Sequence, residues 1–241
     1  ALNHGSNVVG TLLPIREVGR IARRRGVLYL VDAAQTAGAY PIDVEADGID
    51  LLAFTGHKAL LGPQGTGGLY IGPRVGLEAL RPLLRGGTGS RSELEEQPEF
   101  LPDRYESGTL NGPGIAGLGA AVRFLLGETV AKVRAHEVAL TRRLLEGLAR
   151  IPRVVAYGPP DAEQRLANVA FNVEGLQPSE VGLRLDEEFG ILCRVGLHCA
   201  PAAHRTLGTY PGGSVRWGLG YFSSAQEVDD ALEALETIAR R

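Results

Sequence analysis

Three short, mainly apolar runs in the first third of the chain most constrain its fold. Residues 27–31 form the first run, which ends at Asp32; residues 50–54 form the second and residues 67–71 the third. A run that stays apolar without alternating is typical of a strand buried on both faces of a parallel sheet. A helical stretch at residues 15–25 precedes the first run, after a proline and before a glycine. Strands that alternate with helices in this way predict an α/β architecture.

The rest of the chain contains a long polar loop and a second pattern of helices and strands. Residues 86–102 are rich in Gly, Ser and Glu and predict a loop, and helical periodicity returns from residue 114. Residues 130–151 predict a long amphipathic helix that bridges two domains. We expect residues 1–126 to belong to a large domain, and residues 127–241 to comprise the bridging helix and a small C-terminal α+β domain. The small domain is predicted to contain strands near 154–156, 169–173 and 214–219, and helices at 179–189 and 225–239.

Charge and cysteine content argue against several classes of protein. The 241 residues carry a net charge of −3, so the sequence lacks the basic surface that a nucleic-acid partner requires. No apolar run approaches the length of a membrane span, and no signal peptide is visible. Only two cysteines are present, fewer than a secreted disulfide scaffold needs, so a reducing, cytoplasmic setting is expected.

Two ionisable residues next to predicted strands give the first indication of a site. Asp32 ends the first run, and Lys58 lies just beyond the second. In open α/β sheets, ligands bind at the carboxyl ends of the strands. A pyridoxal cofactor needs a lysine amine for its aldehyde and an acid to keep its pyridine nitrogen protonated, and the chain has only one other lysine, Lys132. Taken singly, each residue is also explained by a helix cap or a solvated charge.

Three sequence motifs surround these residues. They are Val-Asp-Ala-Ala-Gln at 31–35, Phe-Thr-Gly-His-Lys at 54–58 and Gly-Pro-Gln-Gly-Thr-Gly-Gly-Leu at 62–69. In order and spacing they resemble the signature of the class V aminotransferase and cysteine desulfurase family. The resemblance implies the type I pyridoxal-phosphate-dependent (PLP-dependent) transferase fold, an α/β fold whose large domain has a mixed, mostly parallel sheet, here N-terminally incomplete. The glycine clusters match neither a P-loop nor a Gly-x-Gly-x-x-Gly motif, and no Gly-x-Ser-x-Gly elbow is present.

The same resemblance assigns roles around a pyridoxal 5'-phosphate cofactor. Lys58 matches the lysine that holds the cofactor covalently, and Asp32 matches the acid that pairs with the ring nitrogen. The other matched positions are Gln35 at the ring hydroxyl oxygen, Thr55 and His57 at the phosphate, and Asn7 close to cofactor and substrate. Thr109, in Arg-Tyr-Glu-Ser-Gly-Thr-Leu-Asn at 104–111, matches a threonine that reaches the phosphate of the neighbouring subunit, which implies a homodimer.

A second motif, Arg-Val-Gly-Leu-His-Cys-Ala-Pro at 194–201, supplies a candidate nucleophile. It resembles the catalytic loop of SufS-like desulfurases and selenocysteine lyases, in which Cys199 takes the nucleophile position. A nucleophilic cysteine needs exposure and nearby positive charge, which we expect from Arg194, His198 and His204. Cys193 is expected to be an ordinary small apolar residue. A zinc site made from these two cysteines and two histidines is an alternative, but the spacing matches no zinc motif.

Arg216 completes the predicted site. It lies in Ser-Val-Arg-Trp-Gly-Leu at 214–219 and matches the family arginine that grips the substrate α-carboxylate, with Arg194 in an assisting role. A guanidinium suits this task because its planar fork binds a carboxylate through two hydrogen bonds. Trp-Gly after the arginine departs from the commonest family form.

The resemblance therefore implies a PLP-dependent cysteine desulfurase, which converts L-cysteine to L-alanine and leaves a persulfide on Cys199. Selenocysteine lyase and class V aminotransferase activities are alternatives within the family, and a non-catalytic relative is the alternative outside it. A homodimer, a sulfur-acceptor protein and sulfur transfer for iron–sulfur cluster assembly follow from the same resemblance. Because the chain contains no methionine and starts at a position that lies inside the family's large domain, residues 1–241 alone are expected to be inactive.

Overall fold

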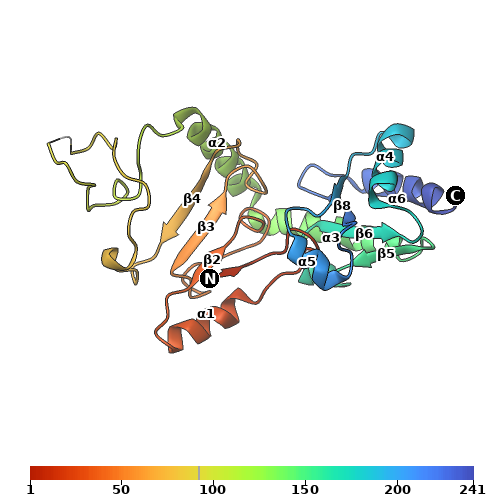
Figure 1. Ribbon diagram of the computed structural model, residues 1–241, viewed down its shortest axis with the longest axis horizontal. Coiled ribbons are helices and arrows are strands. Elements are labelled where there is room, and N and C mark those ends of the chain that lie inside the picture. Colours follow the sequence, from red (N-terminus) through yellow and green to blue (C-terminus); the bar gives the residue numbers. More distant parts are fainter. Residues whose placement is uncertain (92) are drawn as a thin grey trace.

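The computed structural model describes residues 1–91 and 93–241, and these form two four-stranded sheets (Figure 1). The first sheet has the order β1-β2-β3-β4, and its strands are Leu2–Asn3, Leu30–Asp32, Leu51–Thr55 and Gly67–Ile71. β1, β2 and β3 run parallel, whereas β4 is antiparallel to β3. The helix α1, Ile15–Arg24, connects β1 to β2. The α/β architecture predicted for this half is therefore correct, and its sheet is mixed.

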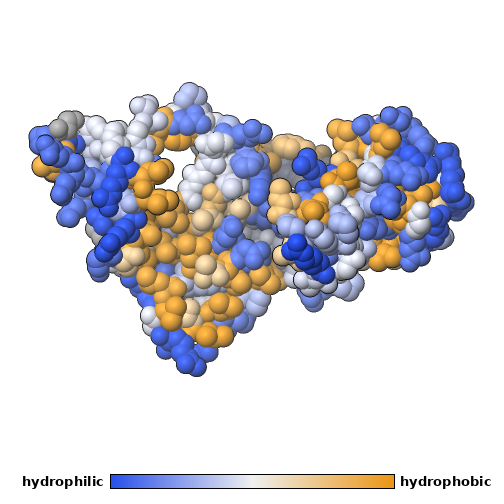
Figure 2. Space-filling view, viewed as in Figure 1, coloured by the Kyte–Doolittle hydropathy of each residue, from blue (hydrophilic) through white to orange (hydrophobic). Residues whose placement is uncertain are grey.

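The strand β2 starts three residues later than the apolar run predicts. It begins at Leu30, and the residues before it lie outside the ladder, since the amide of Val27 donates to the carbonyl of Ala22 at the end of α1. Val27 and Leu28 are 56% and 38% exposed, so the prediction of a strand buried on both faces is wrong at these positions. Figure 2 shows apolar side chains gathered on the surface over this half of the molecule.

The helix α1 packs closely against the first sheet. This core consists of Ile15, Tyr29, Val31 and Ile49, with Leu2, Val18, Ala22, Ile42, Val44 and Leu52 around it. Position 19 requires glycine, because a Cβ there would collide with the backbone carbonyl of Asp47. Arg16 fixes the same contact, since its Nε donates to Asp47 Oδ1 at 2.8 Å.

A long and mostly irregular segment leads from β4 to the second half of the molecule. It contains the short 3₁₀ helix η1, Leu77–Ala79, and its described residues up to 111 extend away from the sheet (Figure 1). Two helices follow, α2 at Gly112–Glu128 and α3 at Val130–Leu148, bent by 78° where they meet at Thr129. Among the described residues no single helix is long and apolar enough to cross a membrane. The bent pair α2 and α3, taken together, has the length and apolar composition of a membrane-spanning segment. The break lies close to the predicted domain boundary, and the division into domains stays a prediction.

The second sheet is antiparallel throughout and has the order β5-β6-β8-β7. In this order its strands are Val154–Tyr157, Asn168–Val173, Ser214–Gly218 and Arg194–Gly196. The helices α4, Pro178–Phe189, and α6, Ala225–Ala239, lie where the periodicity predicts them, as do all strands except β7. The sequence did not predict β1, β7, the helix α5 at Pro201–Leu207, or the 3₁₀ helices η1 and η2, the latter at Ala162–Gln164. All are short, so periodicity has too few residues to reveal them.

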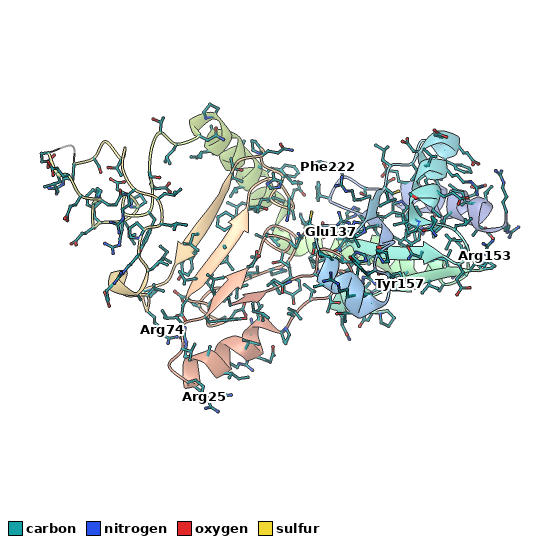
Figure 3. The ribbon with its side chains drawn as sticks, in the orientation of Figure 1. Arg25, Arg74, Glu137, Arg153, Tyr157 and Phe222 are labelled. Carbon is teal, nitrogen blue, oxygen red and sulfur yellow. The ribbon has the colours of Figure 1, made fainter. Side chains whose placement is uncertain are left out.

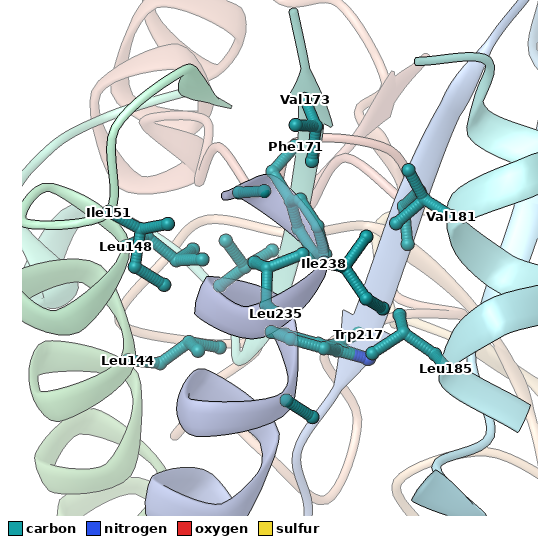
Figure 4. Packing of buried hydrophobic residues seen from close by; sticks show 14 of the residues in the cluster. Leu144, Leu148, Ile151, Phe171, Val173, Val181, Leu185, Trp217, Leu235 and Ile238 are labelled. Carbon is teal, nitrogen blue, oxygen red and sulfur yellow. The ribbon is translucent and has the colours of Figure 1, made fainter. Parts of the chain in front are cut away.

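The side chains of β6 and β8 alternate between the two faces of the second sheet. Val169, Phe171 and Val173 of β6, with Val215 and Trp217 of β8, pack in the core with α3, α4 and α6 (Figure 4). Side chains of a strand alternate in direction, so the residues between them point away from this core. That second face carries mainly polar residues, namely Asn168, Asn172, Ser214 and Arg216.

Candidate active site

Polar side chains gather at the carboxyl edge of the first sheet. Because the first three strands are parallel, with Asn3 beside Asp32 and Asp32 beside Ala53, they end at one edge. Asp32 is exposed there, and its Oδ1 accepts from the amide of Ala34 at 2.9 Å. Thr55, the last residue of β3, donates its Oγ1 to the carbonyl of Ala34 at 3.5 Å. The structure therefore brings the predicted residues Asp32 and Thr55 to one turn.

A cavity of about 320 Å³ opens between this edge and the second sheet. Gln35 and Lys58 line it from the side of the first sheet, and Asn168 and Gly218 line it from the second. Glu137 of α3 also lines the cavity and lies between the two halves of the molecule (Figure 3). Two of the predicted cofactor residues thus face the second sheet, and His57, next to Lys58, is exposed.

Asn7 joins the loop after β1 to two other parts of the predicted site. Its side-chain Nδ2 donates to the backbone oxygen of His198 at 2.6 Å. Its own backbone oxygen accepts from Nη1 of Arg216 at 2.6 Å. A residue near the start of the chain is therefore bonded to the residue that precedes Cys199 and to the predicted substrate-binding arginine. Asn7, the loop that carries Cys199 and Arg216 are thus brought together, and their roles stay predictions.

The backbone around Cys199 has an uncommon conformation. Cys199 lies between β7 and α5 and is exposed, and both it and His198 have positive φ, 60° and 50°. Non-glycine residues adopt this left-handed region rarely, and such strain is often found at functional sites. Cys193 differs, because it packs against the hydrophobic core and burial raises the pKa of its thiol.

The two histidines near Cys199 do not supply the positive charge expected of them. His198 is 7% exposed, with its Nε2 3.1 Å from Ser214 Oγ, and burial lowers its pKa to about 4. His204 is fully buried, with its Nδ1 2.8 Å from Thr209 Oγ1, and burial lowers its pKa too. Both rings are therefore neutral at neutral pH, and the prediction was wrong because residue type alone does not reveal burial.

Two arginines supply the charge instead. Arg194 of β7 lies directly opposite Arg216 of β8 in the antiparallel ladder. Burial lowers the pKa of Arg216 most and the charge of Arg194 lowers it further, whereas Cys199 raises it. Like charges placed opposite one another destabilise a sheet, so this pair favours an anion beside it. A carboxylate or a thiolate would relieve the repulsion.

Two other expectations for the site concern Thr109 and a zinc ion. Thr109 is exposed in the segment between β4 and α2, and the role predicted for it belongs to a second subunit, so it stays a prediction. Among the described residues, no group of three or more His, Cys, Asp or Glu side chains is placed to hold a metal ion.

Two polar residues that line the cavity, Asn168 and Glu137, were not predicted from the sequence. Glu137 carried a usable signal, since it lies four residues after Val133 and three before Leu140 on the apolar stripe of α3. An acid within such a stripe is either paired or functional. Asn168 starts a predicted strand, and nothing in the neighbouring sequence distinguishes it from an ordinary polar residue at a strand end.

The fold and the site together define a class of protein. The chain belongs to the aminotransferase class-V family, whose model matches residues 1–231. Among curated relatives, a probable cysteine desulfurase of Methanothermobacter thermautotrophicus is 38% identical over 99% of the chain and 60% of that relative. Probable cysteine desulfurase 2 of Mycobacterium leprae is 36% identical over 100% of the chain and 58% of that relative.

Solved structures give the same result for the fold. The apo cysteine desulfurase of Thermococcus onnurineus NA1 matches with a TM-score of 0.89 at 35% identity, over 99% of this chain and 60% of that one. A cysteine desulfurase of Escherichia coli matches with a TM-score of 0.85 at 28% identity, over 99% of this chain and 58% of that one. The predicted type I PLP-dependent transferase fold is therefore confirmed. The chain spans about 60% of the length of these relatives.

Proposed function

We propose that this chain carries the greater part of the active site of a PLP-dependent cysteine desulfurase. The observation that carries the proposal is the position of Asn7, bonded to the Cys199 loop and to Arg216 beside the edge at which Asp32 lies. The names of the relatives, cysteine desulfurases in each comparison above, support the same activity. The related activities on selenocysteine and in amino transfer have no observation in their favour.

The residues at the sheet edge fit a pyridoxal phosphate cofactor. Lys58 provides an amine in the cavity, and Asp32 provides an exposed carboxylate at the end of β2. Gln35 lines the same cavity and would bond the ring hydroxyl oxygen, while Thr55 and His57 would contact the phosphate. When bound, the cofactor supplies an electron sink for charge that develops at the substrate Cα. The carboxylate of Asp32 favours the protonated ring nitrogen on which that property depends.

The protein's own side chains would carry out the remaining steps. Arg216, assisted by Arg194, binds the α-carboxylate of L-cysteine and fixes its orientation. The Lys58 amine takes the proton from the substrate Cα. The Cys199 thiolate then attacks the substrate sulfur; an S–S bond forms, and the Cβ–S bond breaks with its electron pair left on carbon. Proton return to carbon gives L-alanine, so one cysteine and one thiol become alanine and one persulfide.

We also propose the arrangement around this chain. Residues 1–126 form the large domain, and residues 127–241 form the bridging helix and small domain. Thr109, exposed on a segment that extends from the sheet, reaches the site of a second subunit in a homodimer. The exposed Cys199 persulfide passes its sulfur to an acceptor protein, for example in iron–sulfur cluster assembly. A reducing, cytoplasmic setting suits a free catalytic thiol.

The cofactor assignment is tested by borohydride reduction of the complete gene product that contains these residues, followed by peptide mapping. The label is expected on Lys58, and a label on Lys132 would refute the assignment.

The reaction is tested with Cys199→Ser and its matched control, Cys193→Ser. The first variant should bind cofactor and cysteine yet form no alanine, and the control should form alanine normally. Unchanged sulfur release by Cys199→Ser would remove this residue from the mechanism. Formation of a keto acid in place of alanine would indicate an aminotransferase. Turnover of selenocysteine by a protein that does not turn over cysteine would indicate a selenocysteine lyase.

A further inference from the structure

We propose that Asn168 is a positioning residue of this site, which aims Arg216 and the Cys199 loop by fixing the backbone of Asn7. The inference rests on the proposed function, and it adds a residue that would act through the backbone of Asn7.

The side chain of Asn168 holds the loop after β1 from both sides of Asn7. Its Nδ2 donates to the backbone oxygen of Ser6 at 3.2 Å and to that of Val8 at 3.2 Å. An amide nitrogen has two hydrogens, so both are used on carbonyls that flank one residue. Val8 itself is completely buried, which leaves this loop little freedom to move.

Asn168 is in turn fixed by its own backbone. Its carbonyl accepts from Nη2 of Arg165 at 3.1 Å, and Nη1 of the same guanidinium donates to the carbonyl of Pro159 at 2.8 Å. Arg165 is 1% exposed, and next to it the amide of Leu166 donates to the carbonyl of Gly10 at 2.8 Å. Gly10, at the end of the loop after β1, is therefore attached to the residues that lead directly into β6.

The constraint on Asn7 reaches both functional groups of the second sheet. The backbone oxygen of Asn7 orients Nη1 of Arg216, and its side chain holds the carbonyl of His198, beside the strained Cys199. A guanidinium has five N–H donors, so a single bond from Nη1 leaves the fork of Nε and Nη2 for a carboxylate. The Asn7 carbonyl thus selects which edge of Arg216 faces the substrate.

The strand register explains why Asn168 suits this role. Asn168 pairs with Gly218 and Ala170 pairs with Arg216, so the asparagine and the arginine lie on the same face of neighbouring strands. Both side chains bond to the same short loop, one to residues 6 and 8 and the other to residue 7. A rigid sheet therefore sets the distance between the loop and Arg216.

The test compares Asn168→Leu, which is similar in size but has no donor, with Asn172→Leu. Asn172 lies on the same strand and face, and its Nδ2 also makes two hydrogen bonds, to Tyr157 Oη at 3.3 Å and to the carbonyl of Gly213 at 3.1 Å. In the complete gene product, Asn168→Leu should raise KM for cysteine about tenfold with a smaller change in kcat, as expected for loss of a half-buried side chain that donates two hydrogen bonds. Asn172→Leu should leave KM near the wild-type value.

A second measurement does not depend on turnover. In cofactor-free protein at a fixed neutral pH, iodoacetamide should alkylate Cys199 more slowly in Asn168→Leu and in Arg216→Ala than in wild type. A cysteine reacts faster beside a positive charge, and Arg216 is then either no longer held in place or absent. Asn168→Ser, which keeps one donor, should fall between wild type and Asn168→Leu, and it serves as the test if the leucine variant does not fold.

The outcomes separate the two proposals. If wild-type protein makes no alanine from cysteine, the proposed function fails, yet the alkylation rates still test the positioning of Arg216. If cysteine is turned over but neither KM nor the alkylation rate of Cys199 differs between wild type and the Asn168 variants, the positioning role is refuted. An equal rise of KM in Asn172→Leu would also overturn it, because the effect would then be general to the strand.

Discussion

Replacing Glu137 with glutamine should make the folded chain more stable above pH 7. Glu137 lies on the apolar stripe of α3 and is 5% exposed. Burial raises the pKa of its carboxyl group from a usual value of 4.5 to about 7, and the charge of Arg134 opposes this only in part. Arg134 donates instead to backbone carbonyls, among them that of Arg165 at 2.7 Å. The carboxylate is therefore poorly compensated once it ionises.

The size of the effect follows from the two pKa values of Glu137. Below pH 4.5 the carboxyl group is protonated in both the folded and the unfolded chain, so burial carries no penalty. Between pH 4.5 and 7 the folded state keeps a proton that the unfolded state has lost, and stability falls as pH rises. At about 1.4 kcal/mol for each unit of pKa difference, the full destabilisation above pH 7 is about 3–4 kcal/mol.

Urea unfolding followed by tryptophan fluorescence measures this directly. Trp217 is the only tryptophan, and it is buried in the core that α3 helps to form. The stability gained in Glu137→Gln should be near zero below pH 4.5 and should grow to about 3–4 kcal/mol above pH 7. Glu146→Gln, on the exposed side of the same helix, is the matched control and should show no such rise. A gain for Glu137→Gln that does not change with pH, or a loss of stability above pH 7, would refute the reasoning.

Three further predictions concern packing and thiol reactivity. Leu235→Ala, at a fully buried position in the core that contains Phe171 and Trp217, should lower the free energy of unfolding by about 2–5 kcal/mol in the same urea assay. Gly19→Ala should lower Tm in a circular-dichroism melt because its Cβ has no room, whereas Gly127→Ala, exposed in α2 with open space around it, should leave Tm unchanged or higher. Iodoacetamide at neutral pH should label Cys199 well before Cys193, whose thiol is partly buried, and equal labelling in peptide maps would contradict the assigned environments.

Local sequence predicted the elements that are long enough to repeat a pattern several times, and it missed the short elements that depend on contacts with distant parts of the chain. α6 and β6 were predicted closely because fifteen and six residues repeat one pattern. β7 has only three residues and exists because β8 pairs with it. Val27 and Leu28 were misassigned since an apolar run does not reveal where its pairing starts.

The candidate site was predicted from motifs rather than from contacts. The motifs indicated Asn7, Cys199 and Arg216, but the two hydrogen bonds that join them span 191 and 209 residues of sequence, beyond the reach of any local pattern. The error over His198 has the same origin, because its neutral state depends on burial that only the folded chain determines.

The two faces of β6 and β8 have a consequence for how this chain tolerates change. Substitutions at odd-numbered positions, such as Phe171 and Val215, should appear in a mutational scan as losses of folded protein. Substitutions of Asn168 or Arg216, on the even-numbered face, should yield folded protein with altered chemistry. A single-residue insertion within either strand would exchange the two faces for every residue that follows it in the strand. Lineages that carry this fold can therefore vary the polar face of these strands by substitution, but scarcely the length of the strands.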